Sequence, residues 1–123
     1  MNRVLAVVGA AFGFGGRTRS GRNVPRCAVF ARIEEPLMPL ERGRKYEDPL
    51  NSALRRAGLG RVAGGGSVQG LDGSIEWISL DLELFDLGLG LEFVRDQLRA
   101  LGAPKGSVLK FKKGESIATV LIG

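Results

Sequence analysis

Residues 61–85 read RVAGGGSVQGLDGSIEWISLDLELF, and this stretch decides the fold. The pair Asp72-Gly73 is a strong turn signal, because an acid followed by glycine suits the backbone of a two-residue hairpin loop. After the turn, apolar residues occupy the even positions of 78–84 and polar residues the odd ones, which is typical of a strand with one apolar face. The stretch therefore predicts a β-hairpin on which the rest of the chain packs.

The hairpin also carries two irregularities. With these turn residues, Val68 faces Trp77 across the hairpin. Ile75 and Trp77 have the opposite parity to the apolar positions of 78–84, so we expect a β-bulge near Trp77 or an exchange of faces at the strand tip. The glycine run 64–66 lies opposite this break. Phosphate-binding loops lead into a helix and this run leads into a strand, so it predicts a bulge or a close backbone approach rather than a phosphate site.

The composition limits the chemistry that the chain can perform. Its 123 residues are enough for one domain, with 44% hydrophobic and 25% charged residues. There is one cysteine, Cys27, and no histidine, which excludes disulfide frameworks, Cys/His zinc sites and serine–histidine triads. Cys27 stands in an apolar run and is interpreted as a small core residue. We expect no cofactor and no metal site.

The net charge of +5 comes from the N-terminal end of the chain, where residues 1–30 carry five arginines and no acid. Residues 1–25 are predicted to be a flexible basic Gly/Arg-rich tail, with an N-terminal targeting peptide as the alternative, and residues 26–123 a single domain. The apolar run 4–16 is too short to span a membrane, so we expect a soluble, cytoplasmic protein. Because the basic excess sits on the tail, a nucleic-acid partner is disfavoured.

Helix signals flank the hairpin on both sides. Asp48 is a good N-cap, Pro49 suits the first helical position and Gly58 suits the left-handed position after the last turn. The other predicted elements are a strand over 27–33, a helix over 87–101 capped by Asp86, and strands over 108–112 and 116–122.

The resulting order is β-α-β-β-α-β with an extra C-terminal strand, which resembles the ferredoxin-like α+β sandwich. The resemblance rests on element order alone. It implies a two-layer fold in which two helices cover one face of an antiparallel sheet and the first and third strands lie side by side in its centre. The residues then expected in the core are Val29, Ala31, Ile33, Ile78, Leu80, Leu82, Leu109 and Phe111.

The opposite face of that sheet is the predicted place of function, as a binding or interface surface. Its members are Phe30, Arg32, Glu34, Trp77, Ser79, Asp81, Glu83, Lys110 and Lys112. The resemblance implies dimerisation through or near this face, a recurrent use of the fold, with small molecules often bound at or near the seam. In this interpretation Arg32 and Lys110 form cross-strand ion pairs with the acids of the surface.

Two other interpretations stay open. An enzyme would use two of Glu34, Asp81 and Glu83 as acid–base groups or as ligands of a hard metal ion such as Mg²⁺. Binding of single-stranded nucleic acid would use Phe30 and Trp77 as stacking platforms, but the neighbouring acids repel phosphate. Without histidine or an activated cysteine, the sequence favours a non-catalytic binding or assembly module that forms a homodimer, with a small molecule or protein as a further partner. It assigns no catalytic residue.

Overall fold

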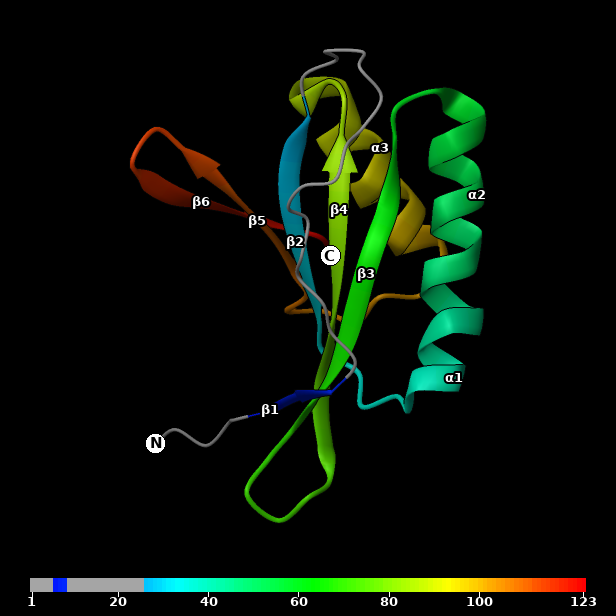
Figure 1. The fold of residues 1–123 in the computed structure, drawn as a ribbon, viewed down its shortest axis with the longest axis vertical. Coiled ribbons are helices and arrows are strands. Elements are labelled where there is room, and N and C mark those ends of the chain that lie inside the picture. The colour runs from blue at the N-terminus through cyan, green and yellow to red at the C-terminus, as the bar shows by residue number, and fades with distance from the viewer. Residues whose placement is uncertain (1–5, 9–25) are drawn as a thin grey trace.

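The computed structural model describes residues 6–8 and 26–123, in which an antiparallel sheet carries helices on one side (Figure 1). The strands are β1 (Ala6–Val8), β2 (Cys27–Ile33), β3 (Gly60–Gln69), β4 (Ile75–Leu84), β5 (Val108–Lys113) and β6 (Ser116–Leu121). The helical segments are α1 (Pro39–Arg42), the π-helical segment η1 (Gly43–Glu47), α2 (Asp48–Ala57) and α3 (Leu87–Ala100). Apart from β1, the tail predicted over 1–25 lies outside the described residues and stays a prediction.

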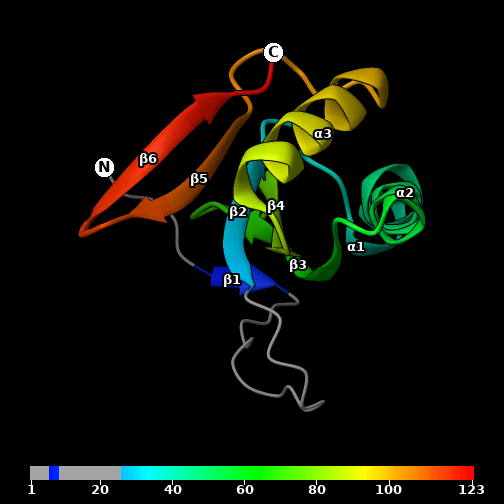
Figure 2. The ribbon, with the colours of Figure 1, turned by 90° about the horizontal axis from the view of Figure 1, so that it is seen from above.

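The strand order across the sheet is β1-β3-β4-β2-β5-β6, and all neighbouring strands are antiparallel. Strand β2 pairs with β4 along its full length, as expected for the first and third strands of the predicted domain. The extra C-terminal strand, β6, pairs with β5 at the edge. Helices α2 and α3 lie on the same side of the sheet (Figure 2). The fold is therefore α+β, with an open antiparallel sheet and helices on one face.

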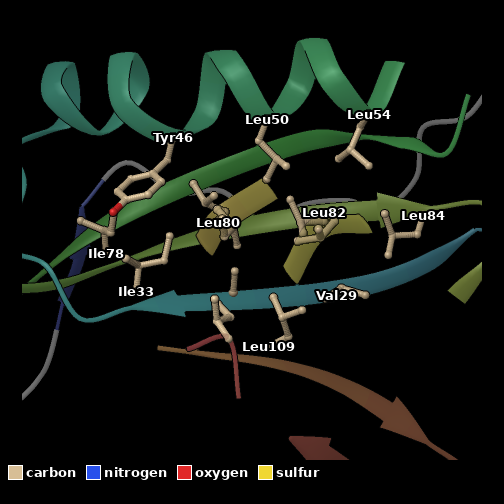
Figure 3. Close-up of a cluster of buried hydrophobic side chains, with 14 residues drawn as sticks. Val29, Ile33, Tyr46, Leu50, Leu54, Ile78, Leu80, Leu82, Leu84 and Leu109 are labelled. Atoms are coloured by element: carbon tan, nitrogen blue, oxygen red, sulfur yellow. The ribbon is translucent and has the colours of Figure 1, made fainter. Parts of the chain in front are cut away.

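The core lies between the helices and one face of the sheet (Figure 3). All the core residues predicted above except Phe111 are buried, with at most 2% of their surface exposed, and the half-buried Phe111 packs against them. Leu50 and Leu54 of α2 and Val94 and Leu98 of α3 close the core from the helix side. Full burial of each such aliphatic side chain contributes about 1.5–3 kcal/mol, so this layer contact is the main source of stability.

The hairpin turn is longer than predicted. The Gly73 N–H donates to the Gly70 carbonyl at 3.1 Å, and the Gly70 N–H donates to the Ser74 carbonyl at 2.9 Å. Leu71 and Asp72 therefore stand at the centre of the turn, and the predicted two-residue loop at Asp72-Gly73 is wrong. Gly73 takes the left-handed position with a φ of 89°, where glycine adds no steric strain.

The bulge predicted near Trp77 is confirmed. Val68 pairs with Trp77, as expected, but the next pair is Gln69 with Ile75, so Glu76 is the extra residue of β4. The extra residue lets two side chains of equal parity point to opposite faces. Ile75 packs against the core, whereas Trp77 lies on the other face of the sheet.

The predicted start of the first helix is wrong. Helical structure begins at Pro39, passes through η1 and reaches Asp48 without a break. The Asp48 N–H donates to the carbonyl of Gly43, five residues back. Pro49 has no N–H, and its ring would clash with the carbonyl four residues earlier in a regular helix. The wider π-helical segment just before it accommodates this proline inside a continuous helical run.

Two other helix ends agree with prediction. Gly58 ends α2 in the left-handed conformation with a φ of 69°, and the Leu59 N–H donates to the Leu54 carbonyl at 3.0 Å. Asp86 caps α3, because its carboxylate accepts the N–H of Leu89 at 2.9 Å. Among the described residues, no helix is long and apolar enough to cross a membrane.

Candidate functional site

The nine residues of the predicted binding or interface surface, here called the candidate surface, come mainly from β2, β4 and β5. Phe30 of β2 lies between its partners Asp81 of β4 and Lys110 of β5. Arg32, two residues further along β2, pairs with Ser79. Because side chains alternate along a strand, these residues point away from the core formed by their neighbours. The sheet thus brings the members of the candidate surface together on the face opposite the helices.

An aromatic and cationic cluster forms the centre of this surface. The guanidinium carbon of Arg32 lies 4.0 Å from the centroid of the Trp77 ring, a close cation–π contact. The rings of Phe30 and Trp77 meet edge to face, with centroids 6.4 Å apart and an interplanar angle of 82°. Arg32 also forms an ion pair with Glu34. These contacts hold the Trp77 side chain in one orientation on the sheet.

Two of the three candidate acids, Glu34 and Glu83, form ion pairs. The partners of Glu83 differ from those expected. Glu34 pairs with Arg32, although the two lie two residues apart along the chain and the expected pair was a cross-strand one. Its backbone N–H donates to the Ser107 hydroxyl at 3.0 Å. Glu83 accepts from Arg61 at 3.0 Å and lies 3.5 Å from Arg26. The ion pairs expected for Lys110 are not found among the described residues, and Lys112, for which none was expected, forms none with them either.

A second bulge explains why Glu83 has a partner that the sequence did not indicate. Val62 pairs with Leu82 and Gly64 pairs with Asp81, so Ala63 is an extra residue on β3. This shift places Arg61 directly opposite Glu83. A regular hairpin would place Arg61 one position away, on the other face. The bulge thus supplies the base that covers Glu83, which is 9% exposed.

The remaining acid, Asp81, has a different environment. It is half-buried, and burial raises the pKa of its carboxyl above the usual value, with a smaller contribution from the negative charge of Glu47. No described residue forms an ion pair or side-chain hydrogen bond with it. Asp81 is therefore the acid of the candidate surface best suited to hold a proton.

The surface does not gather a metal-binding set. Within residues 6–8 and 26–123, no group of three or more His, Cys, Asp or Glu side chains could hold a metal ion. Ser79, the small polar member of the surface, is 3% exposed beside Arg32 and is not available to an external ligand. The accessible groups of the surface are the rings of Phe30 and Trp77, the Arg32–Glu34 ion pair and the lysines Lys110 and Lys112.

Gly65, in the middle of the glycine run 64–66, borders a polar cluster on the helix side. A Cβ atom at Gly65 would collide with the carboxylate of Glu47 and lie 2.8 Å from the Ser79 carbonyl oxygen. Arg42 donates to that carboxylate at 2.9 Å and to the Ser67 hydroxyl at 3.0 Å. The predicted close backbone approach is confirmed at Gly65, and the approaching groups are Arg42 and Glu47.

Comparison of the chain with protein-family models, curated proteins and solved structures found no match.

Proposed function

We propose that this chain is a non-catalytic binding and assembly module that acts as a homodimer, and that its fold is of the ferredoxin-like class. Support for the fold class comes from the order β3-β4-β2-β5, with β2 and β4 in the centre and α2 and α3 on one face. Support for the module comes from the acids of the candidate surface. Glu34 and Glu83 are held by arginines, which leaves them poor candidates for acid–base work.

The observation that carries the assembly proposal lies at the border of the candidate surface. Ile117 and Leu121 of β6 are 62% and 61% exposed. Ile117 pairs with Lys112, and Leu121 pairs with Val108. Paired side chains share a face, so both aliphatic groups lie on the same side of the sheet as the candidate surface. A second copy that covered them would remove apolar surface from water.

Sedimentation velocity on the full chain over a wide concentration range tests this proposal. We expect a reversible dimer that Leu121→Ser weakens. Leu71→Ser is the matched control, because Leu71 is 84% exposed at the hairpin turn, far along the chain from β6. A chain that stays monomeric at every concentration would show the proposal to be wrong. Equal weakening by the two substitutions would also contradict it, because the association would then be non-specific.

One observation favours a second candidate, a carboxylate enzyme. The raised pKa of Asp81 is what a general acid needs in order to keep its proton nearer neutral pH. Thermal unfolding with and without Mg²⁺ tests the form of this enzyme in which the ionised Asp81 carboxylate would be a metal ligand. A Mg²⁺-dependent stabilisation that disappears in Asp81→Asn, together with unchanged self-association of that variant, would favour the enzyme. Absence of any Mg²⁺ effect would contradict that metal-dependent form of the enzyme.

A further inference from the structure

The outer edge of β6 is a template for another strand. β6 is the last strand of the sheet, and among the described residues only β5 pairs with it. The β5–β6 hairpin stands away from α2 and α3 (Figures 1 and 2). An edge strand leaves unpaired N–H and C=O groups on its outer side, and proteins usually protect such edges with lysine, proline or a bulge. β6 reads SIATVL and contains none of these, nor any other charge.

This edge is held in place by the rest of the molecule. Val120 packs against the core, and Ile122, directly after β6, is buried. The Ile122 N–H donates to the Ser107 carbonyl at 2.8 Å, and its own carbonyl accepts from Arg99 at 2.6 Å. A strand that is already ordered loses little conformational entropy when another strand pairs with it.

We propose that two copies of this chain join through antiparallel pairing of their β6 strands, with Thr119 on the two-fold axis. The inference rests on the proposed homodimer and specifies its interface. Two antiparallel strands of one sheet can be related only by an axis perpendicular to the sheet, so residues of equal parity must face each other. When the axis passes through Thr119, Ile117 lies opposite Leu121 of the second copy, and Ala118 lies opposite Val120.

Other registers that pair residues of equal parity bring the two exposed aliphatic side chains together less well. An axis through Ala118 would place Ile117 opposite Thr119 and leave Leu121 without a strand partner. An axis through Val120 would place Leu121 opposite Thr119 and leave Ile117 opposite a residue beyond the end of β6. Only the register centred on Thr119 pairs the two exposed aliphatic side chains with each other. The two candidate surfaces then become one continuous face, with both helix layers on the opposite side.

Charge placed on the axis tests this register. In Thr119→Lys or Thr119→Glu, two like charges would lie directly opposite each other, which opposes pairing. We expect each variant alone to dimerise about tenfold more weakly than the native chain, or worse. An equimolar mixture of the two variants should recover dimerisation as a heterodimer. Far-UV circular dichroism and thermal unfolding of each variant check that the monomer remains folded.

Disulfide trapping provides a second, geometric measurement. In a Cys27→Ala background, Thr119→Cys would place two sulfhydryl groups on residues whose Cβ atoms are about 5 Å apart, close enough to cross-link after a small adjustment. The matched control is Ile117→Cys, where the two copies of the residue would be about 14 Å apart along the strands. We expect oxidation to give a covalent dimer from the first variant and not from the second.

The outcomes separate the inference from the proposed function. A native chain that dimerises, but whose dimer is unchanged in both charged variants and is not trapped by Thr119→Cys, would overturn the β6 interface and leave the homodimer standing. Cross-linking of Ile117→Cys in preference to Thr119→Cys would overturn the register. A chain that is monomeric throughout would overturn the proposed homodimer and the interface with it.

Discussion

At the scale of single residues, Gly65 shows how closely polar groups approach the sheet. A methyl group there would meet the Glu47 carboxylate and the Ser79 carbonyl oxygen, and the backbone oxygen cannot rotate away. We expect Gly65→Ala to lower the free energy of unfolding by about 1–3 kcal/mol. Chemical denaturation with urea measures this. Gly43→Ala is the control, because its Cβ would lie 3.7 Å from Glu47 Oε1, an ordinary contact in a helical segment. An equal loss in both variants would contradict the collision.

Asp81 should make stability depend on pH. The pKa of an aspartate carboxyl is ordinarily 3.8, and burial in the folded protein raises it, so the folded state binds this proton more tightly than the unfolded chain. At higher pH, the charged form opposes folding. Asp81→Asn should therefore increase the free energy of unfolding at pH 7, by at most about 1 kcal/mol because the group is only half-buried. The gain should shrink as the pH falls toward 3.8.

The pKa of Asp72 is shifted in the opposite direction to that of Asp81. Its carboxylate accepts from the Ser74 backbone N–H and hydroxyl, and these hydrogen bonds lower its pKa. The stability that they contribute is present above the unfolded-state pKa and is lost as the pH falls through the folded-state value. Asp72→Asn should thus change stability at pH 7 in the opposite direction to Asp81→Asn. Urea titrations of the two variants at pH 7 and pH 4 compare the signs directly.

At the scale of elements, Arg42 connects the helical run to β3. Its side chain is buried and donates to Glu47 and to Ser67, whose hydroxyl donates to the Leu37 carbonyl at 2.9 Å. Arg42→Leu would leave the Glu47 carboxylate without its partner, and we expect a loss of about 2–4 kcal/mol in the free energy of unfolding. Arg44→Leu removes an exposed arginine two residues away and should change stability by less than about 0.5 kcal/mol. Similar losses in both would show that the buried pair is not stabilising.

Local signals predicted the elements best where no tertiary contact competed with them. Gly58 ends α2 as predicted because a left-handed glycine decides a helix end within one turn. The Asp48-Pro49 pair wrongly predicted the start of a helix, because burial of Tyr46 keeps the chain helical upstream of the proline. On the candidate surface, the alternation of β2 and β4 placed Phe30, Arg32 and Asp81 on one face correctly. The partner of Glu83 could not be predicted, because the glycine run 64–66 indicates a bulge without showing that Ala63 is the extra residue that shifts Arg61.

At the scale of the whole molecule, a homodimer would couple stability to concentration. Unfolding of a dimer also separates its subunits, so a higher concentration favours the folded state by mass action. We expect the thermal midpoint of the native chain to rise by roughly 3–5 °C for each tenfold increase in concentration above the dissociation constant. Scanning calorimetry at several concentrations measures this. Thr119→Lys should show the same rise only at concentrations about tenfold higher or more, and a native chain whose midpoint does not change with concentration would contradict dimerisation.

The extra residue of β4 also bears on how the length of this chain could vary. Deleting Glu76 would make Ile75 and Trp77 adjacent, and adjacent residues of a regular strand already point to opposite faces. The hairpin should therefore keep Ile75 in the core and Trp77 beside Arg32 with one residue fewer, which far-UV circular dichroism and Trp77 fluorescence would verify. Deleting Ser79, three residues later, would exchange the two faces of part of β4 and should abolish folding. Two single-codon losses so close in the gene would thus have opposite consequences.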